Sequence, residues 1–216
     1  MRSAVGILAI SALQVWLGMP GALAQSREVK DLGVGKLLVA PRDAPDPAFA
    51  ETVILIVNYD ANGAVGLMLN RKTTVPVARV LPDLKNSGKR EDSMYMGGPV
   101  EIEGVMILFR SEAKEAATHL FNKLYLATSK EGLDEAVGRQ KKDARDFRFY
   151  AGYCGWSPGQ LEHELKLGGW YILDRSEDAV FDTHPDTLWS RLIEKAEVEF
   201  VFLTGNPYRP TARSSF

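Results

Sequence analysis

Eight apolar runs of strand length recur between residues 34 and 203, and they constrain the fold more than any other feature of this chain. They are rich in Val, Ile, Leu, Phe and Tyr, and Gly, Pro, Asp or Asn bounds them, which is typical of strands separated by turns. Their recurrence predicts a β-rich core. The predicted strands are Val34–Ala40, Thr52–Tyr59, Val65–Asn70, Val105–Phe109, Leu124–Thr128, Phe147–Tyr153, Trp170–Leu173 and Val198–Leu203. Asn62-Gly63 predicts a hairpin between the second and third.

Helices are expected between these runs. Ser157-Pro158-Gly159-Gln160 offers a capping hydroxyl, a proline and a Gln able to bond back to the cap, and so predicts a helix to about Leu167. A second helix is predicted from His184-Pro185 to about Lys195, because apolar residues recur there at helical spacing. Two more are predicted at 131–142 and 76–81. Strands and helices do not alternate regularly, so the sequence predicts one α+β domain.

The first 24 residues have the composition of a secretory signal peptide. Residues 3–26 contain no charged side chain, and the apolar run Ala4–Gly18 follows a single positive residue, Arg2. The small residues of Ala22-Leu23-Ala24 suit a signal peptidase, so we expect cleavage after Ala24. A membrane-spanning helix needs roughly 20 apolar residues, which makes a retained anchor the weaker alternative. We therefore expect export, to the periplasm, with a cytoplasmic location as the alternative.

These features divide the chain into a signal peptide (1–24), a polar segment (25–32), one folded domain (33–205) and a loose tail (206–216). Without the leader the chain has 25 basic and 28 acidic residues, a formal charge of −3. That balance argues against nucleic-acid binding, which usually needs a basic face. The one dense basic patch, from Arg139 to Arg148, contains Asp143 and Asp146 and is expected to be a solvated helix end.

A catalytic motif is suggested by Gly155-Trp156-Ser157-Pro158-Gly159, which matches the Gly-x-Ser-x-Gly pattern of hydrolases. In that pattern the backbone N–H of the residue after the serine helps to stabilise the oxyanion. Pro158 has no N–H, so this donor is missing. We therefore expect no catalytic residue and interpret Ser157 as a helix cap. A hydrolase that uses Ser157 or Cys154 is the rival hypothesis.

No metal site and no cofactor are expected. His163-Glu164 begins the helical zinc-protease pattern, but position 167, one turn later, is Leu instead of the second His. Cys154 is the single cysteine, so an intramolecular disulfide is excluded even in an oxidising compartment. It lies beside glycines at the end of a predicted strand, where we expect a buried, inert thiol.

Five segments, taken in order, resemble the YqgE/AlgH family. The resemblance extends from about Gly33 to Thr204, and the order of the segments carries it more than any single motif. The segments are GKLLVA at 35–40, DPAF at 46–49 with TV at 52–53, GAVGLMLNR at 63–71, GGPV at 97–100 and GYCGWSPGQLE at 152–162.

The resemblance implies an α+β fold in which a bifurcated, mostly antiparallel sheet forms a pseudo-barrel with flanking helices. It implies no catalytic residue and no cofactor. Family members have been proposed to regulate transcription, and they generally lack an export signal. A cytoplasmic transcriptional regulator is therefore the second alternative.

Our leading hypothesis is an exported, non-catalytic binding or regulatory module. Its partner would be a protein, a peptide or a small anionic ligand, and not nucleic acid if the chain leaves the cytoplasm. Glycine-rich turns allow close backbone approach, and polar or stacking side chains beside them would line a groove. Removal of the Arg71 side chain is predicted to weaken partner capture. The candidate binding residues are Asp46, Asn70, Arg71, Gly97, Gly98 and Trp156.

Overall fold

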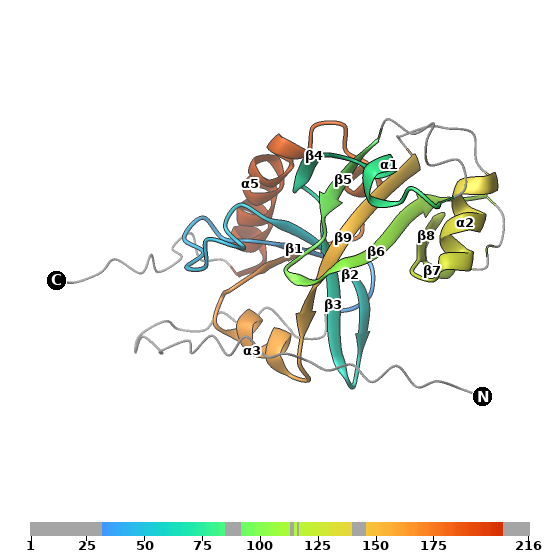
Figure 1. Ribbon diagram of the computed structural model, residues 1–216. Coiled ribbons are helices and arrows are strands. Elements are labelled where there is room, and N and C mark those ends of the chain that lie inside the picture. Colours follow the sequence, from blue (N-terminus) through green and yellow to red (C-terminus); the bar gives the residue numbers. More distant parts are fainter. Residues whose placement is uncertain (1–31, 85–91, 113–114, 116, 140–145, 205–216) are drawn as a thin grey trace.

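The computed structural model describes residues 32–84, 92–112, 115, 117–139 and 146–204. The predicted leader, nearly all of the polar segment after it and the C-terminal tail lie outside the described residues. The described part contains ten strands and five helices (Figure 1). The strands are β1 (Leu37–Val39), β2 (Val53–Asp60), β3 (Gly63–Met68), β4 (Lys72–Pro76), β5 (Ser93–Met96), β6 (Val100–Arg110), β7 (Thr118–Phe121), β8 (Leu124–Ala127), β9 (Phe147–Trp156) and β10 (Tyr171–Leu173). The helices are α1 (Val77–Val80), α2 (Lys130–Arg139), α3 (Gln160–Lys166), α4 (Glu177–Val180) and α5 (Pro185–Thr204).

The strands form one curled sheet that forks at β9. The main path runs β10-β1-β2-β3-β9-β6-β8-β7, with β4 and β5 branching from it. One edge of β9 pairs with β6, while the other edge is shared, because β5 pairs with Tyr150 and Ala151 and β3 pairs with residues 154–156. Among the strands that the structure describes, β5 and β9 are parallel, and the other strand pairs are antiparallel. The predicted single α+β domain with a bifurcated, mostly antiparallel sheet is confirmed.

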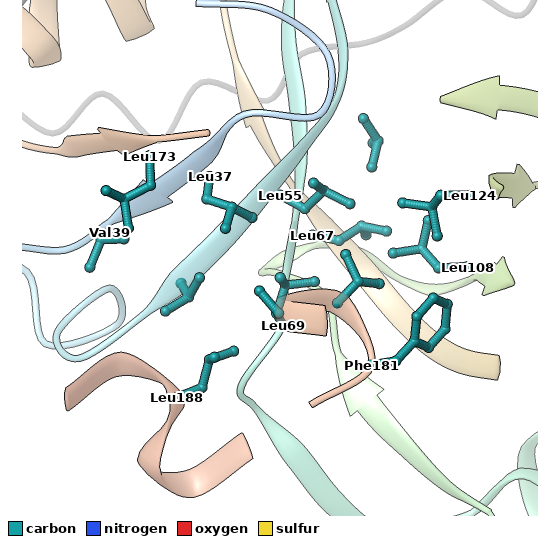
Figure 2. Close-up of a cluster of buried hydrophobic side chains, with 14 of the residues drawn as sticks. Leu37, Val39, Leu55, Leu67, Leu69, Leu108, Leu124, Leu173, Phe181 and Leu188 are labelled. Carbon is teal, nitrogen blue, oxygen red and sulfur yellow. The ribbon is translucent and has the colours of Figure 1, made fainter. Parts of the chain in front are cut away.

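The concave side of the sheet encloses the largest apolar cluster (Figure 2). Leu37, Leu55 and Leu67 enter it from neighbouring strands β1, β2 and β3, and Leu108 enters from β6 beyond the fork. Helices α4 and α5 close the cluster, since Ala179, Val180, Leu188 and Ile193 are all buried in it. Burial of apolar area on this scale is the main favourable contribution to folding.

The outer faces of the two halves are covered separately. Leu161 and Leu165 of α3 pack on the β1–β3 half, together with Trp156 and Trp170. Helices α1 and α2 cover the β6 half, where α2 contributes Leu133, Ala136 and Val137. In Figure 1, α2 accordingly lies beside β7 and β8, and α3 lies on the opposite side of the molecule near the end of β9. These are the flanking helices of the predicted pseudo-barrel.

The predicted hairpin at Asn62-Gly63 joins β2 to β3. Asp60 pairs with Gly63, so Ala61 and Asn62 are the two connecting residues. The Asn62 N–H donates to the Asp60 carboxylate at 2.7 Å, and Gly63 has a φ of 121° that favours glycine. The predicted hairpin is therefore present, but its two connecting residues lie one position earlier in the chain than Asn62-Gly63.

The predicted strand Val198–Leu203 is wrong, because these residues belong to α5, which runs from Pro185 to Thr204. Valine and phenylalanine favour strands, but the buried positions of this segment follow a helical period. Leu188 and Ala196 are buried in the core, and Phe200, four residues after Ala196, packs edge-on against Tyr171 at 5.9 Å. The helical spacing of the buried residues therefore outweighs the strand preference of valine and phenylalanine in this segment.

The predicted start of α3 is also wrong. The helix begins at Gln160, its N-cap is Gly159 with a φ of 78°, and no side chain caps it. Ser157 and Pro158 instead form a turn, in which the Gln160 N–H donates to the Ser157 carbonyl at 3.0 Å. The Gln160 side chain does bond back as predicted, since its Oε1 accepts the Ser157 N–H at 3.1 Å.

Four elements were not predicted: β4, β5, β7 and α4. Strand β4 reads Lys-Thr-Thr-Val-Pro and is mostly exposed, and β7 reads Thr-His-Leu-Phe at the end of the sheet. Short polar strands at an edge lack the apolar alternation that identifies strands. No helix within the described ranges is long and apolar enough to span a membrane.

Candidate functional site

Asn70 and Arg71, two of the predicted binding residues, hold the segment just before β2. The Asn70 side chain accepts the Val53 N–H at 3.0 Å and donates to the Glu51 carbonyl at 2.8 Å. Arg71 Nη2 donates to the Ala50 carbonyl and, at 3.1 Å, to the Thr52 hydroxyl. The two side chains thus act together, and these polar contacts go to the protein's own chain.

Asp46 belongs to the same loop. Its Oδ1 accepts the Ala48 N–H at 2.9 Å, and its carbonyl accepts the Phe49 and Ala50 N–H groups, each at 3.0 Å. This geometry is an aspartate-capped turn. The turn places the Phe49 ring edge-on against Trp170, with centroids 5.9 Å apart. The structure therefore brings Asp46, Asn70 and Arg71 to one loop, where they stabilise its path.

Gly97 and Gly98 lie at the fork, where β9 changes partners from β5 to β3. The Gly97 N–H donates to the Ala151 carbonyl at 2.8 Å, and the Gly97 carbonyl accepts the Met68 N–H at 2.9 Å. A Cβ at Gly97 would lie 2.2 Å from the Gly152 oxygen, and one at Gly98 would lie 2.1 Å from the Tyr153 carbonyl carbon. Backbone therefore already fills the space that these glycines leave.

Trp156 is buried beneath α3, and its indole is fixed by Glu164. The Trp156 Nε1–H and the Trp170 Nε1–H both donate to Glu164 Oε2, at 2.9 and 2.8 Å. The Gln160 amide donates to Glu164 Oε1 at 3.0 Å. One carboxylate thus ties α3 to the end of β9 and to the residue before β10. The indole ring lies in the core cluster with Cys154 and Leu161.

Ser157, the candidate hydrolase nucleophile, is exposed in the turn before α3. Within the described residues its hydroxyl has no histidine partner. His119 Nε2 bonds to the Asn122 carbonyl at 2.8 Å, and His184 Nδ1 bonds to the Thr183 hydroxyl at 2.9 Å. A serine nucleophile needs a base within hydrogen-bond reach, and the contacts of this part of the chain supply none.

Cys154, the other candidate nucleophile, is buried, and its Sγ lies 3.5 Å from the Gly97 carbonyl. Burial raises the pKa of this thiol, and the nearby Glu164 carboxylate raises that pKa further. A reactive cysteine needs the opposite shift. The predicted inert thiol fits this environment. Across the described residues, no group of three or more His, Cys, Asp or Glu side chains could hold a metal ion.

For Arg148 the predicted solvated helix end is wrong, whereas Lys141, Lys142 and Arg145 of the same patch lie outside the described residues. Arg148 is a buried residue of β9 whose guanidinium donates to the Phe147 and Asp182 carbonyls, both at 3.0 Å. The guanidinium also lies over the Tyr95 ring, 5.2 Å from its centroid. Arg148 therefore crosses the concave side of the sheet to reach the turn between α4 and α5.

Sequence reasoning missed a bulge in β6, formed by Glu101–Gly104. Val100 pairs with Tyr153 and Val105 pairs with Ala151, so four residues of β6 face only Gly152 of β9. The turn is tight, since a Cβ at Gly104 would lie 3.1 Å from the Glu101 carbonyl oxygen. Glu101 has a φ of 46°, in the left-handed region that L side chains rarely adopt.

The bulge exposes an isoleucine. The Ile102 side chain is 65% exposed, and Met96 of β5, which pairs with Ala151, is 49% exposed. A Cβ at Gly152 would lie 3.3 Å from the Ile102 Cα and 2.5 Å from the Gly98 oxygen, so both segments meet the same turn of β9. Ile102 has the largest exposed fraction of the large apolar residues in the described part of the chain. The only signal in the sequence is an isoleucine between two glutamates, Glu101-Ile102-Glu103.

Glu101 lies near Tyr153 of β9. The pKa of Tyr153 is raised first by burial and then by the Glu101 charge. A non-glycine residue in the left-handed region costs of order 1 kcal/mol or more and persists only where the surroundings hold it. Glu51, with a φ of 53°, and Asn122, with a φ of 46°, share this conformation, so the exposure of Ile102 and not the strain distinguishes the bulge.

A match to a protein-family model identifies the chain. The model is described as AlgH-like, and it matches residues 37–201. The chain belongs to the AlgH-like family. A UPF0301 protein of Chlorobaculum tepidum is 31% identical to this AlgH-like protein. The alignment covers 86% of the present chain and 98% of the relative. A second UPF0301 protein, from Methylococcus capsulatus, is 36% identical over 75% of the chain and 90% of the relative.

Solved structures agree with the family. The AlgH-like domain matches the solution structure of the AlgH protein from Pseudomonas aeruginosa with a TM-score of 0.62 and 28% identity, over 81% of this chain and 94% of that one. Protein DIP2367 from Corynebacterium diphtheriae matches with a TM-score of 0.63 at 23% identity, over 82% and 94% of the two chains, and so shows the fold alone. The resemblance seen in the sequence is confirmed.

Proposed function

We propose that this AlgH-like protein is an exported, non-catalytic binding module, and that it contacts a protein partner through the β6 bulge. The observation that carries the proposal is Ile102, which the β6 bulge leaves exposed to solvent. A buried side chain of this type contributes roughly 1.5–3 kcal/mol relative to an exposed one. Removal of the Ile102 side chain from water would therefore favour association.

The contacts of the other candidate residues favour the β6 bulge over the glycine-rich turns as the binding surface. Asn70 and Arg71 bond to the loop at 50–53, and Gly97 and Gly98 have backbone against them. These groups meet the protein's own chain, whereas the bulge meets solvent. Partner binding by the bulge thus replaces the glycine groove in our leading hypothesis.

The hydrolase alternative lacks a supporting contact in the described part of the chain. Ser157 has no bonded histidine there, and Cys154 is buried with a raised pKa. A screen of ester and peptide substrates should give the same rates for the wild type, Ser157→Ala and Cys154→Ala. Activity that either substitution abolishes would establish the hydrolase instead.

Photo-cross-linking in cells tests the binding surface. A benzophenone amino acid at position 102 is expected to form one discrete adduct with another protein, because that position would lie in the interface. The control is position 198, where Val198 is similarly exposed at 54% on α5. The same adduct pattern from both positions, or no adduct from position 102, would contradict the proposed surface.

Export is tested by cell fractionation with N-terminal sequencing. Cleavage after Ala24 should leave Gln25 as the first residue, in the periplasmic fraction. A chain that retains Met1 in the cytoplasm would instead support the regulator alternative, because cytoplasmic partners would then be within reach.

A further inference from the structure

The charge around Ile102 points to the chemistry of the partner. Glu101 and Glu103 flank Ile102 directly in the bulge, and all three residues are exposed. Gly104 follows and contributes no side chain, and no basic residue lies between Val100 and Phe109. The bulge therefore presents one apolar side chain between two carboxylates.

The two carboxylates make the rim of the bulge acidic. Behind the bulge, Tyr153 is only partly exposed and packs against the main core. Charges on a partner that are opposite in sign to those of Glu101 and Glu103 would complement this rim.

We infer that the bulge of this protein fits a partner protein with an apolar socket rimmed by lysine or arginine, which receives Ile102 between Glu101 and Glu103. This inference rests on the proposed binding function and adds the partner's chemistry to it. The bulge protrudes from its strand pairing, so the partner's surface is concave. Apolar contact at the centre with opposite charges at the rim is the usual anatomy of such interfaces.

The experiment uses the full-length protein and the partner identified by cross-linking from position 102. Association rates are measured for the wild type, for Glu101→Gln with Glu103→Gln, and for Glu101→Lys with Glu103→Lys. Rim charges act mainly on the association rate and its salt dependence. We expect the double Lys variant to associate about tenfold more slowly and the wild-type rate to fall with salt. The double Gln variant should lose most of that salt dependence, because it removes both carboxylate charges and keeps side chains of the same size.

A charge-matched control excludes a general effect of net charge. Glu131→Lys with Glu194→Lys changes the formal charge equally at exposed positions on α2 and α5, and its association rate should stay within about twofold of the wild type. Thermal unfolding of each variant shows that it is folded.

Three outcomes would overturn the inference. If the bulge variants associate as fast as the control, the partner has no basic rim. If the double Lys variant associates faster than the wild type, the partner's rim is acidic. Both outcomes leave binding through the bulge intact. An adduct from position 102 with a second copy of this chain would replace the separate partner by self-association. The absence of any adduct from position 102 counts instead against the proposed function.

Discussion

At the scale of single residues, the fork of the sheet is packed around glycines whose Cβ positions the neighbouring backbone already occupies. At Gly98 an added Cβ would lie within 2.4 Å of three backbone atoms of Tyr153 and Cys154. Backbone on both sides of the fork cannot move away without breaking strand pairing. The glycines of Gly97-Gly98-Pro99 are thus explained by close strand packing. From the sequence alone, they could equally have belonged to a turn that binds a ligand.

Gly98→Ala is expected to lower the free energy of unfolding by about 2–4 kcal/mol, because the added methyl group collides with backbone. The matched control is Gly33→Ala, since nothing lies within 4 Å of a Cβ at Gly33. That control should change stability by less than about 1 kcal/mol. Urea unfolding followed by circular dichroism measures both, and equal stability of the two variants would show that the fork tolerates a side chain.

At the scale of elements, α3 is attached to the sheet by polar contacts as well as by its apolar face. Leu161 and Leu165, one turn apart on the helix, are both buried. The Glu164 carboxylate accepts hydrogen bonds from both indole N–H groups, and the Glu162 carboxylate accepts one from the Tyr59 hydroxyl at 2.6 Å. Burial, and after it the hydrogen bond to Glu162, together raise the pKa of Tyr59 to about 12. No sequence rule pairs Glu164 with Trp156 and Trp170, because the helix must first be placed on the sheet.

Glu164→Leu is expected to destabilise the protein by about 2–3 kcal/mol, because two indole N–H groups in a mostly buried site lose their acceptor. Glu164→Gln keeps one carbonyl oxygen and should cost less. Lys166→Ala, at an exposed position of the same helix, serves as the control for helix propensity. Tryptophan fluorescence during urea unfolding gives the three values. A Leu variant as stable as the Lys166 variant would show that Glu164 does not anchor α3.

Local patterns explain why some elements were predictable and others were not. The runs around β2, β3 and β9 have strong apolar patterns, and they are strands. The run at Val198–Leu203 has strand-like composition but continues the helical spacing of α5. Strands β4 and β7 are short and polar, and their pairing partners rather than their own residues define them.

At the scale of the whole molecule, the fork places the bulge. Strand β9 pairs with β6 on one edge and with β5 and then β3 on the other, and Gly152, with a φ of 69°, lies where these arrangements meet. Non-local pairing of this kind leaves no periodic signal in the sequence. The family resemblance supplied the forked sheet, but the exposed Glu101-Ile102-Glu103 turn appears only once β6 and β9 are in register.

The same architecture separates the loop at 46–53 from the β6 bulge. The loop at 46–53 is fixed by Asp46, Asn70 and Arg71 on the β2–β3 side, whereas the bulge belongs to the β6 branch of the fork. A partner bound at one surface need not touch the other. The backbone amides that a bound partner protects from hydrogen exchange therefore show which of the two surfaces it occupies.

Hydrogen–deuterium exchange of the full chain, alone and with its cross-linked partner, tests the central claim most directly. Residues 101–104 lie outside the β6–β9 register, so their amides should exchange quickly in the free protein. Partner binding is predicted to slow exchange at 96–105 and to leave 46–53 and α5 unchanged. Protection at 46–53 around Arg71, with no change at the bulge, would contradict the proposed surface and favour the loop that Arg71 holds.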